Sequence, residues 1–373
     1  MGGAAAFLRR ETALFAGIAT LLAFQFLLPP AGSAPAFLSA VFFCWLFGVM
    51  LLGALAVVRH ADALAELLGE PYGTLILTLS VVGIEVSLIA AIMLSGETSP
   101  TLARDTMFAV LMIVLNGLVG LSLLIGAVKH REQDYNSPGA QAFLSVIVPL
   151  SVFALILPDF TRTTATPTFS PTQALFFSGV TLLLYGVFLG IQTVRHQGYF
   201  TQPGEAAEKA PREIALEHHG HATYPLWLHA VMLILSLLPI VLLSKKLAGY
   251  IDLGISAMEL PVAVGGVLIA LLVLSAEGIS AVKSAWSNHL QRSVNICMGS
   301  ALSTIGMTVP AALLIGLFVG QPVELGLEPV EMVLLVLTLL VSTLTFAGGR
   351  TNLLQGAVHL VLFFSYLALI FNP

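Results

Sequence analysis

The sequence predicts an all-α, polytopic membrane protein with about eleven transmembrane helices, and three observations carry this prediction. Hydrophobic residues make up 57% of the 373 residues and charged residues only 9%, whereas a soluble domain has roughly 25% charged residues. The apolar residues recur in runs of about 20, which is the length of an α-helix that crosses a bilayer. Lysine and arginine gather in alternate loops between these runs, as they do in membrane proteins.

Turn-forming residues separate the runs, among them Pro29-Pro30, Ser137-Pro138-Gly139 and Gln202-Pro203-Gly204. The first run resembles a signal peptide, but a proline directly after the candidate cleavage site disfavours cutting, so we expect a retained helix. We expect spans over residues 12–29, 34–58, 73–95, 105–128, 140–158, 173–194, 225–243, 261–284, 294–318, 330–347 and 351–371. The segment from Arg59 to Tyr72 is expected to form a short amphipathic helix at the membrane surface.

The 15 lysines and arginines fall unevenly on the two sides of the membrane that these spans define. Eleven lie on one side: Arg9, Arg10, Arg59, Lys129, Arg131, Arg195, Lys209, Arg212, Lys283, Arg292 and Arg350. The other four are Arg104, Arg162, Lys245 and Lys246. Since cytoplasmic loops carry the excess of positive charge, we expect a multi-pass protein of the inner (plasma) membrane with a cytoplasmic N-terminus and an external C-terminus.

The order of the spans indicates an internal repeat. We divide the chain into a leader helix (1–33), a five-helix group (34–194), a polar cytoplasmic loop (195–224) and a second five-helix group (225–373). The second helix of each group contains a lone glutamate, and the next helix of each ends in Leu-Leu-Ile-Gly. Because five is odd, the two groups enter the membrane in opposite senses, an architecture typical of secondary transporters.

The two lone glutamates are the strongest functional signal. Glu85 lies at the centre of its span and Glu277 lies deep in its own. An acidic residue at mid-membrane costs roughly 2.5–3.5 kcal/mol, and such residues commonly mark ion or proton pathways. One alone fits equally well a protonated side chain that only bonds neighbouring helices. Two at corresponding positions of a repeat favour an ion-binding site.

Charge then suggests the chemistry. Without a cation, desolvation and mutual repulsion favour the protonated carboxyls, whereas a bound cation favours the carboxylates, so protons and cations compete. Two carboxylates match one Ca²⁺, which takes about six to eight oxygen ligands, so neutral groups must supply the rest. We expect these supporting ligands among Ser80, Ser87, Asn116, Ser275, Ser300, Ser303 and Thr304, although each hydroxyl more often bonds its own helix backbone.

Several stretches resemble the calcium/cation antiporter superfamily, and within it the calcium/proton exchanger branch and its bacterial ChaA-type antiporters. The residues around Glu85 (Val82 to Leu88) and Glu277 (Leu274 to Ile279) resemble the two signature repeats. Other matching stretches run from Gly299 to Pro310, from Tyr185 to His196 and from Gly349 to Gly356. The resemblance implies a Ca²⁺/H⁺ antiporter in which Glu85 and Glu277 bind the ion, with Na⁺/H⁺ or K⁺/H⁺ antiport as the alternative. Neither signature has the asparagine that precedes the glutamate in the wider family, which leaves the cation open.

The polar loop 195–224 is rich in glutamate and histidine. The run Glu217, His218, His219 and His221 suits a transition metal, although a solvated linker has the same composition. The family has an acidic stretch here that is proposed to be regulatory, and a pH-sensing role is a hypothesis whose test is transport against pH after deletion of residues 205–221. His229 and His359 lie inside spans, where a helix–helix hydrogen bond is a more frequent role than a proton relay.

Other classes of function are disfavoured. The spans contain no aspartate pair, no Gly-x-Ser-x-Gly and no His-Glu-x-x-His, so a membrane enzyme is not expected. No phosphate-binding loop is present, so neither ATP drive nor any cofactor beyond the transported cation and protons is expected. No basic cluster suggests nucleic acid, and the two cysteines, Cys44 and Cys297, lie in apolar runs and suggest no disulfide. A non-transporting membrane scaffold remains the alternative from another class.

Overall fold

The computed structural model describes residues 7–29, 31–68, 72–93, 101–203 and 224–372. Within these ranges the chain is almost entirely helical, and β1 (Gln133–Asp134) pairs with β2 (Arg350–Thr351) in a short antiparallel ladder. The chain divides into two compact units. Unit 1 comprises Met1–Thr98 and Leu216–Ala276, and unit 2 comprises Ser99–Ala215 and Glu277–Pro373. Each unit therefore takes helices from both halves of the sequence.

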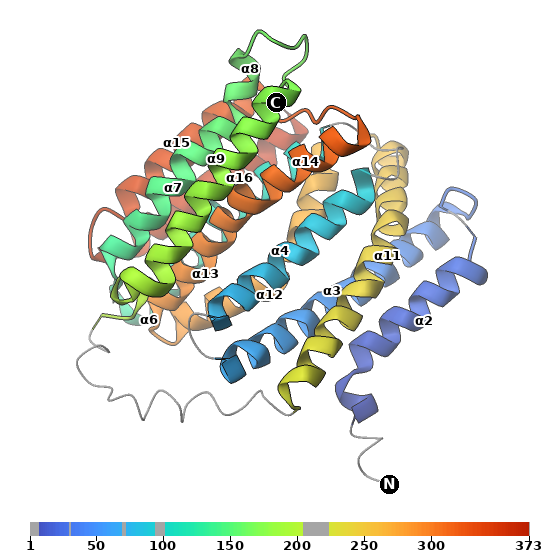
Figure 1. Ribbon diagram of the computed structural model, residues 1–373, viewed down its shortest axis with the longest axis horizontal. Helices are drawn as coiled ribbons and strands as arrows, with labels where there is room; N and C mark the ends of the chain where they lie inside the picture. The colour runs from blue at the N-terminus through green and yellow to red at the C-terminus, as the bar shows by residue number, and fades with distance from the viewer. Residues whose placement is uncertain (1–6, 30, 69–71, 94–100, 204–223, 373) are drawn as a thin grey trace. The chain divides into compact units, whose positions relative to one another are not determined.

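Unit 1 is built on two long helices, α3 (Ala36–Leu68) and α11 (Leu226–Met258), which pack along each other (Figure 1). The shorter α2 (Thr12–Phe26) and α4 (Tyr72–Met93) each pack against both. Glycines let α2 and α3 approach α11 closely. A Cβ at Gly17 would lie 2.9 Å from the Cβ of Pro239. The first part of α12 (Ala263–Trp286) completes the unit.

Unit 2 holds the rest of α12 and the remaining helices, several of which continue into one another as single spans (Figure 1). The elements are α5 (Leu102–Met112), the π-helix η1 (Ile113–Leu118), α6 (Val119–His130), α7 (Ser137–Leu155), α8 (Leu157–Phe160), α9 (Pro171–Gly190), the π-helix η2 (Ile191–Arg195), the 3₁₀-helix η3 (Gln197–Phe200), α13 (Leu290–Ser303), the π-helix η5 (Thr304–Thr308), α14 (Val309–Val319), α15 (Pro329–Thr345) and α16 (Leu353–Phe371).

Glycines also permit a close helix contact in unit 2, between α6 and α16. A Cβ at Gly356 would lie 2.6 Å from the backbone nitrogen of Leu124, and one at Gly120 would lie 2.9 Å from the backbone nitrogen of Leu360. Small residues that let two backbones meet are the usual device for packing helices in a membrane, where van der Waals contact replaces the hydrophobic effect between them.

The predicted helical spans are confirmed. Each of the eleven coincides with a helix or with an unbroken run of helices in the described residues. Eight of these runs are long and apolar enough to cross a membrane, and α2 and α15 are shorter apolar helices. The protein is therefore a polytopic, all-α membrane protein.

Two expected boundaries were wrong, both in unit 1. The segment after Arg59 is no separate amphipathic helix, because α3 continues to Leu68 and buries His60, Ala61 and Leu64. Similarly, α11 does not stop near residue 243 but runs to Met258. A helix of 33 residues is about 50 Å long and exceeds the hydrocarbon thickness of a bilayer. Hydropathy marks only the apolar part of such a helix, so its polar extension was missed.

A chain of buried polar groups links the start of α2 with α3 and α11. The fully buried Glu11 carboxylate accepts from Arg59 at 2.7 Å and lies 3.1 Å from Nε2 of His60. Nδ1 of His60 lies 3.0 Å from Nδ1 of His229, whose Nε2 accepts the Tyr224 backbone N–H at 3.2 Å. Because that N–H can only donate, His229 carries its proton on Nδ1 and donates to His60, which donates from Nε2 to Glu11.

Candidate ion-binding site

Glu85 lies in the middle of α4, within unit 1. It is 2% exposed, and Ile84 and Leu88 beside it are equally buried. Ser80, one turn earlier, donates its hydroxyl to the Ile76 carbonyl at 2.6 Å, and Ser87 is partly exposed. A buried carboxyl among apolar side chains requires either a proton or a counter-charge, which is the property that the sequence assigns to an exchange site.

Glu277 lies on α12 and is the first residue of the second segment of unit 2, Glu277–Pro373. Ser300 on α13 donates its hydroxyl to Oε2 of Glu277 at 2.6 Å. This contact joins two residues that the sequence predicts for one ion site. The next residue, Gly278, lets α12 approach the π-helix η1, because a Cβ there would lie 3.0 Å from Cδ2 of Leu118. Hence Glu277, Ser300 and the segment that contains Asn116 are neighbours in unit 2.

Two other serines chosen from the sequence bond within their own helices. Ser275 donates to the Leu272 carbonyl at 2.8 Å, and Ser303 donates to the Ser300 carbonyl at 2.9 Å. Both bonds lie within one helix, as expected for serines in apolar helices. Thr304 is 1% exposed and begins the π-helix η5. The lone pairs of these hydroxyls are still acceptors, and Ser300 is the hydroxyl that donates to Glu277.

Asn116 is buried completely in the π-helix η1. Its amide nitrogen donates to Thr338 of α15 at 2.8 Å, and its oxygen lies 3.2 Å from Nδ1 of His359 on α16. His359 is therefore a helix–helix hydrogen-bond partner, the role that the sequence favours for it. The partners Thr338 and Thr345 were not found from the sequence, because threonines in apolar helices carry no distinctive signal.

Two π-helices occupy corresponding places in the sequence. The spans that follow the glutamate helices contain η1 with Asn116 and η5 with Thr304. A π-helix shifts the hydrogen-bond register by one residue and leaves backbone carbonyls less regularly paired, and it frequently marks a functional site. Sequence patterns do not distinguish a π-turn from an α-turn, so this feature was not predicted.

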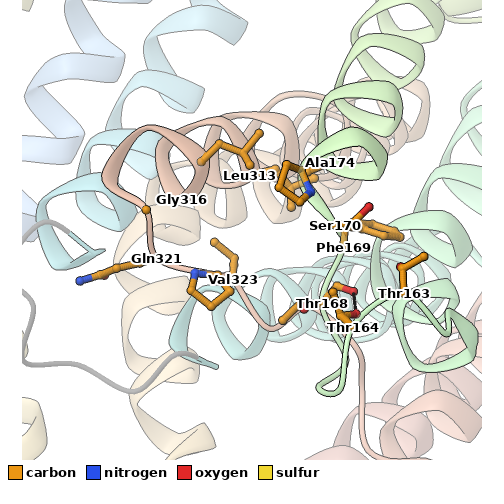
Figure 2. A pocket seen from close by; sticks show the side chains of 14 residues that line it. Thr163, Thr164, Thr168, Phe169, Ser170, Ala174, Leu313, Gly316, Gln321 and Val323 are labelled. Carbon is orange, nitrogen blue, oxygen red and sulfur yellow. Dashed lines mark hydrogen bonds between the residues drawn. The ribbon is translucent and has the colours of Figure 1, made fainter.

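A pocket of about 380 Å³ lies elsewhere in unit 2, between the segment before α9 and the end of α14 (Figure 2). Figure 2 shows the hydroxyls of Thr164 and Thr168 at its wall. The Thr164 hydroxyl donates to the Thr168 carbonyl, and Ser170 caps α9. The described residues that line the pocket carry no charge, so it does not compete with the glutamates as an ion site.

Comparison with known proteins decides the family. The family model described as sodium/calcium exchanger protein matches residues 38–194 and 228–372, which is most of the chain. The chain belongs to this family. The match spans both glutamate helices and the π-helices η1 and η5, and it omits the loop that separates the two halves.

Named relatives agree with this membership. The exchanger is 43% identical over 326 residues to the sodium-potassium/proton antiporter ChaA of Escherichia coli, with 86% of each chain covered. It is 25% identical over 268 residues to a Ca(2+)/H(+) antiporter of Synechocystis, covering 69% of this chain and 71% of that one. The solved structure of YfkE has the same fold, with a TM-score of 0.71 at 18% identity, and the match covers 98% of this chain and all of the other.

The acidic and histidine-rich run of the exchanger, Glu217, His218, His219 and His221, lies outside the described residues. Among the residues that are described, no group of three or more histidine, cysteine, aspartate or glutamate side chains is placed to hold a metal ion. Cys44 and Cys297 are both free, as the sequence predicts.

Proposed function

We propose that this chain is a secondary antiporter that exchanges a cation for protons across the membrane, with Glu85 and Glu277 as the groups for which they compete. The observation that carries the proposal is a carboxylate within a transmembrane helix that receives a hydroxyl donor from the next span, the Glu277–Ser300 bond at 2.6 Å. Glu85, which is 2% exposed, occupies the corresponding place in the other five-helix group that we propose.

The competition follows from the cost of charge inside a membrane. A carboxylate that loses both water and counter-ion is strongly destabilised, so each glutamate takes a proton when no cation is present. A cation replaces that proton by direct attraction. Ser300 can donate to the carboxylate and still offer its oxygen to a cation, since a hydroxyl has two lone pairs. Each turnover thus exchanges one kind of positive charge for another.

Two intramembrane carboxylates favour Ca²⁺ as the cation, because two negative charges neutralise one divalent ion. The second candidate is Na⁺ or K⁺, and a specific observation favours it: the 43% identical relative is named a sodium-potassium/proton antiporter. The 25% identical relative is named a Ca(2+)/H(+) antiporter. Both candidates use the same glutamates, and they differ in the neutral oxygens that complete the site.

The transport cycle that we propose is alternating access between two inverted five-helix groups, residues 34–194 and 225–373, with residues 1–33 as a leader helix. The cytoplasmic cation displaces protons from the glutamates, leaves on the outside, and is replaced there by external protons. The lysine and arginine distribution supports a cytoplasmic N-terminus and loop 195–224, and an external C-terminus.

Everted membrane vesicles test this function. A respiring vesicle acidifies its lumen, and a pH-sensitive dye reports collapse of the gradient when an antiporter lets luminal protons out in exchange for a cation. We expect the proton gradient to collapse on addition of Ca²⁺, or of Na⁺ or K⁺, in vesicles that contain the exchanger. Vesicles from the same host without this protein should show no collapse. Separate additions of each cation identify the substrate. Absence of collapse with every cation, at normal protein abundance, would contradict the proposal.

A further inference from the structure

A buried hydrogen-bond network in unit 2 holds the Asn116 side chain at both ends. Its amide nitrogen donates to Oγ1 of Thr338 at 2.8 Å, and its oxygen is 3.2 Å from Nδ1 of His359. Nε2 of His359 lies 3.0 Å from Oγ1 of Thr345. Asn116, Thr338 and His359 have no exposed surface, and Thr345 is 4% exposed. The network connects η1, α15 and α16.

The partners fix the direction of each bond. A carboxamide oxygen can only accept, so His359 carries a hydrogen on Nδ1 and donates it to Asn116. The Thr338 hydroxyl points its hydrogen at Sδ of Met112, 3.5 Å away, and its oxygen is free to accept from the Asn116 nitrogen. The second hydrogen of that nitrogen lies against the same sulfur at 3.7 Å. Both hydrogens of the amide are thereby used, and its oxygen keeps one lone pair.

The network lies beside the Glu277 site. The π-helix that carries Asn116 packs against α13, the helix of Ser300. Leu118, two residues after Asn116, contacts the position of Gly278, the residue next to Glu277. Since an asparagine can serve a cation only through its oxygen, a donor that fixes the direction of this oxygen also fixes what Asn116 can offer to the site.

We propose that His359 is a positioning residue for exchange: its Nδ1–H holds the Asn116 oxygen in the orientation that the cation site uses. This inference rests on the proposed function and on Asn116 as a supporting ligand. A histidine at position 359 has a physical reason. Leucine at this place would fit the apolar helix but would leave the buried Asn116 oxygen without its donor, and an unpaired buried polar group is costly.

Replacements that imitate one ring nitrogen at a time test the inference. Asparagine places an N–H near the Nδ1 position, whereas glutamine reaches the Nε2 position. We expect His359→Gln and His359→Leu to raise the KM for the cation about tenfold, the lower end of the effect of removing a partner behind a metal ligand, with a smaller change in kcat. We expect His359→Asn to keep the KM close to wild type. The assay is the vesicle assay, with protein abundance and melting temperature measured for each variant.

A second comparison separates positioning from a general loss of packing. Asn116→Ala should raise the KM, and His359→Leu added to it should cause no further loss, because the two residues act as a unit. The inference is overturned if His359→Asn and His359→Gln behave alike, or if the His359→Leu and Asn116→Ala effects simply add. An unchanged KM in Asn116→Ala, with exchange still lost in Glu277→Gln, overturns it while the antiport function stands. Absence of exchange in the wild type would instead remove the proposed function, and this inference with it.

Discussion

Replacing Glu277 or Glu85 by glutamine is expected to abolish cation-induced collapse of the proton gradient. Glutamine has the same shape and accepts the Ser300 hydroxyl as glutamate does, but it can neither bind an exchangeable proton nor neutralise a cation. Loss of an indirect partner of a metal ligand already costs about 10–100-fold in affinity, so loss of the charged ligand should cost roughly 100-fold or more. The dye response in everted vesicles measures the effect for each variant.

The matched control is Glu132→Gln, the same change at a glutamate whose side chain is 59% exposed and which lies 3.7 Å from Arg350. It should leave exchange unchanged. Glu277→Asp, which shortens the side chain and keeps the charge, should retain part of the activity. Normal exchange in either glutamine variant would show that the carboxylate at that position is not required, and a scaffold role would then become the better account of that residue.

The second large effect is expected on stability, from Glu11→Ala. The substitution removes the carboxylate that accepts from Arg59 and the buried His60, and Arg59 keeps the Arg10 carbonyl as a hydrogen-bond acceptor at 2.7 Å. Removing one member of a buried ion pair costs about 3–5 kcal/mol, and we expect the lower end, about 3 kcal/mol, because the Arg59 side chain is 38% exposed and partly solvated. Thermal unfolding in detergent should show a melting temperature several degrees below wild type.

Glu132→Ala serves as the comparison for this prediction as well. Its ion pair with Arg350 is exposed on both sides, and such pairs contribute about 0–1 kcal/mol, so its melting temperature should match the wild type. A Glu11→Ala protein that melts together with Glu132→Ala would mean that the buried chain of Glu11, His60 and His229 does not stabilise unit 1.

The membrane fold could be predicted because its signals are local. Runs of apolar residues and the charges between them follow directly from the thickness and polarity of a bilayer. The glutamates stood out for the same reason, since a charge within an apolar run is costly wherever the helix packs. Ser300 and Glu277 were both predicted as candidate ligands, but their contact was not. A spacing of 23 residues does not show how their helices pack.

Features that depend on packing were missed. No role was predicted for Glu11, because its partners His60 and Arg59 lie about 49 residues away in the sequence. Among the described residues it is nevertheless the most deeply buried acid of unit 1, and these partners compensate its charge. The π-helices at Asn116 and Thr304 depend on a one-residue shift of backbone bonding that no composition reveals. The polar end of α3 was assigned to a separate amphipathic helix, and that of α11 to a loop, because hydropathy falls where each helix continues.

The measurement that tests the central claim most directly uses the purified protein in proteoliposomes with an acidic lumen. Uptake of labelled cation and the internal pH are recorded together. Competition between cation and protons predicts that cation enters as the lumen becomes alkaline, that uptake stops when the pH gradient is removed, and that neither change occurs with Glu85→Gln or Glu277→Gln. Cation uptake that is independent of the pH gradient, or that persists in both glutamine variants, would contradict the account.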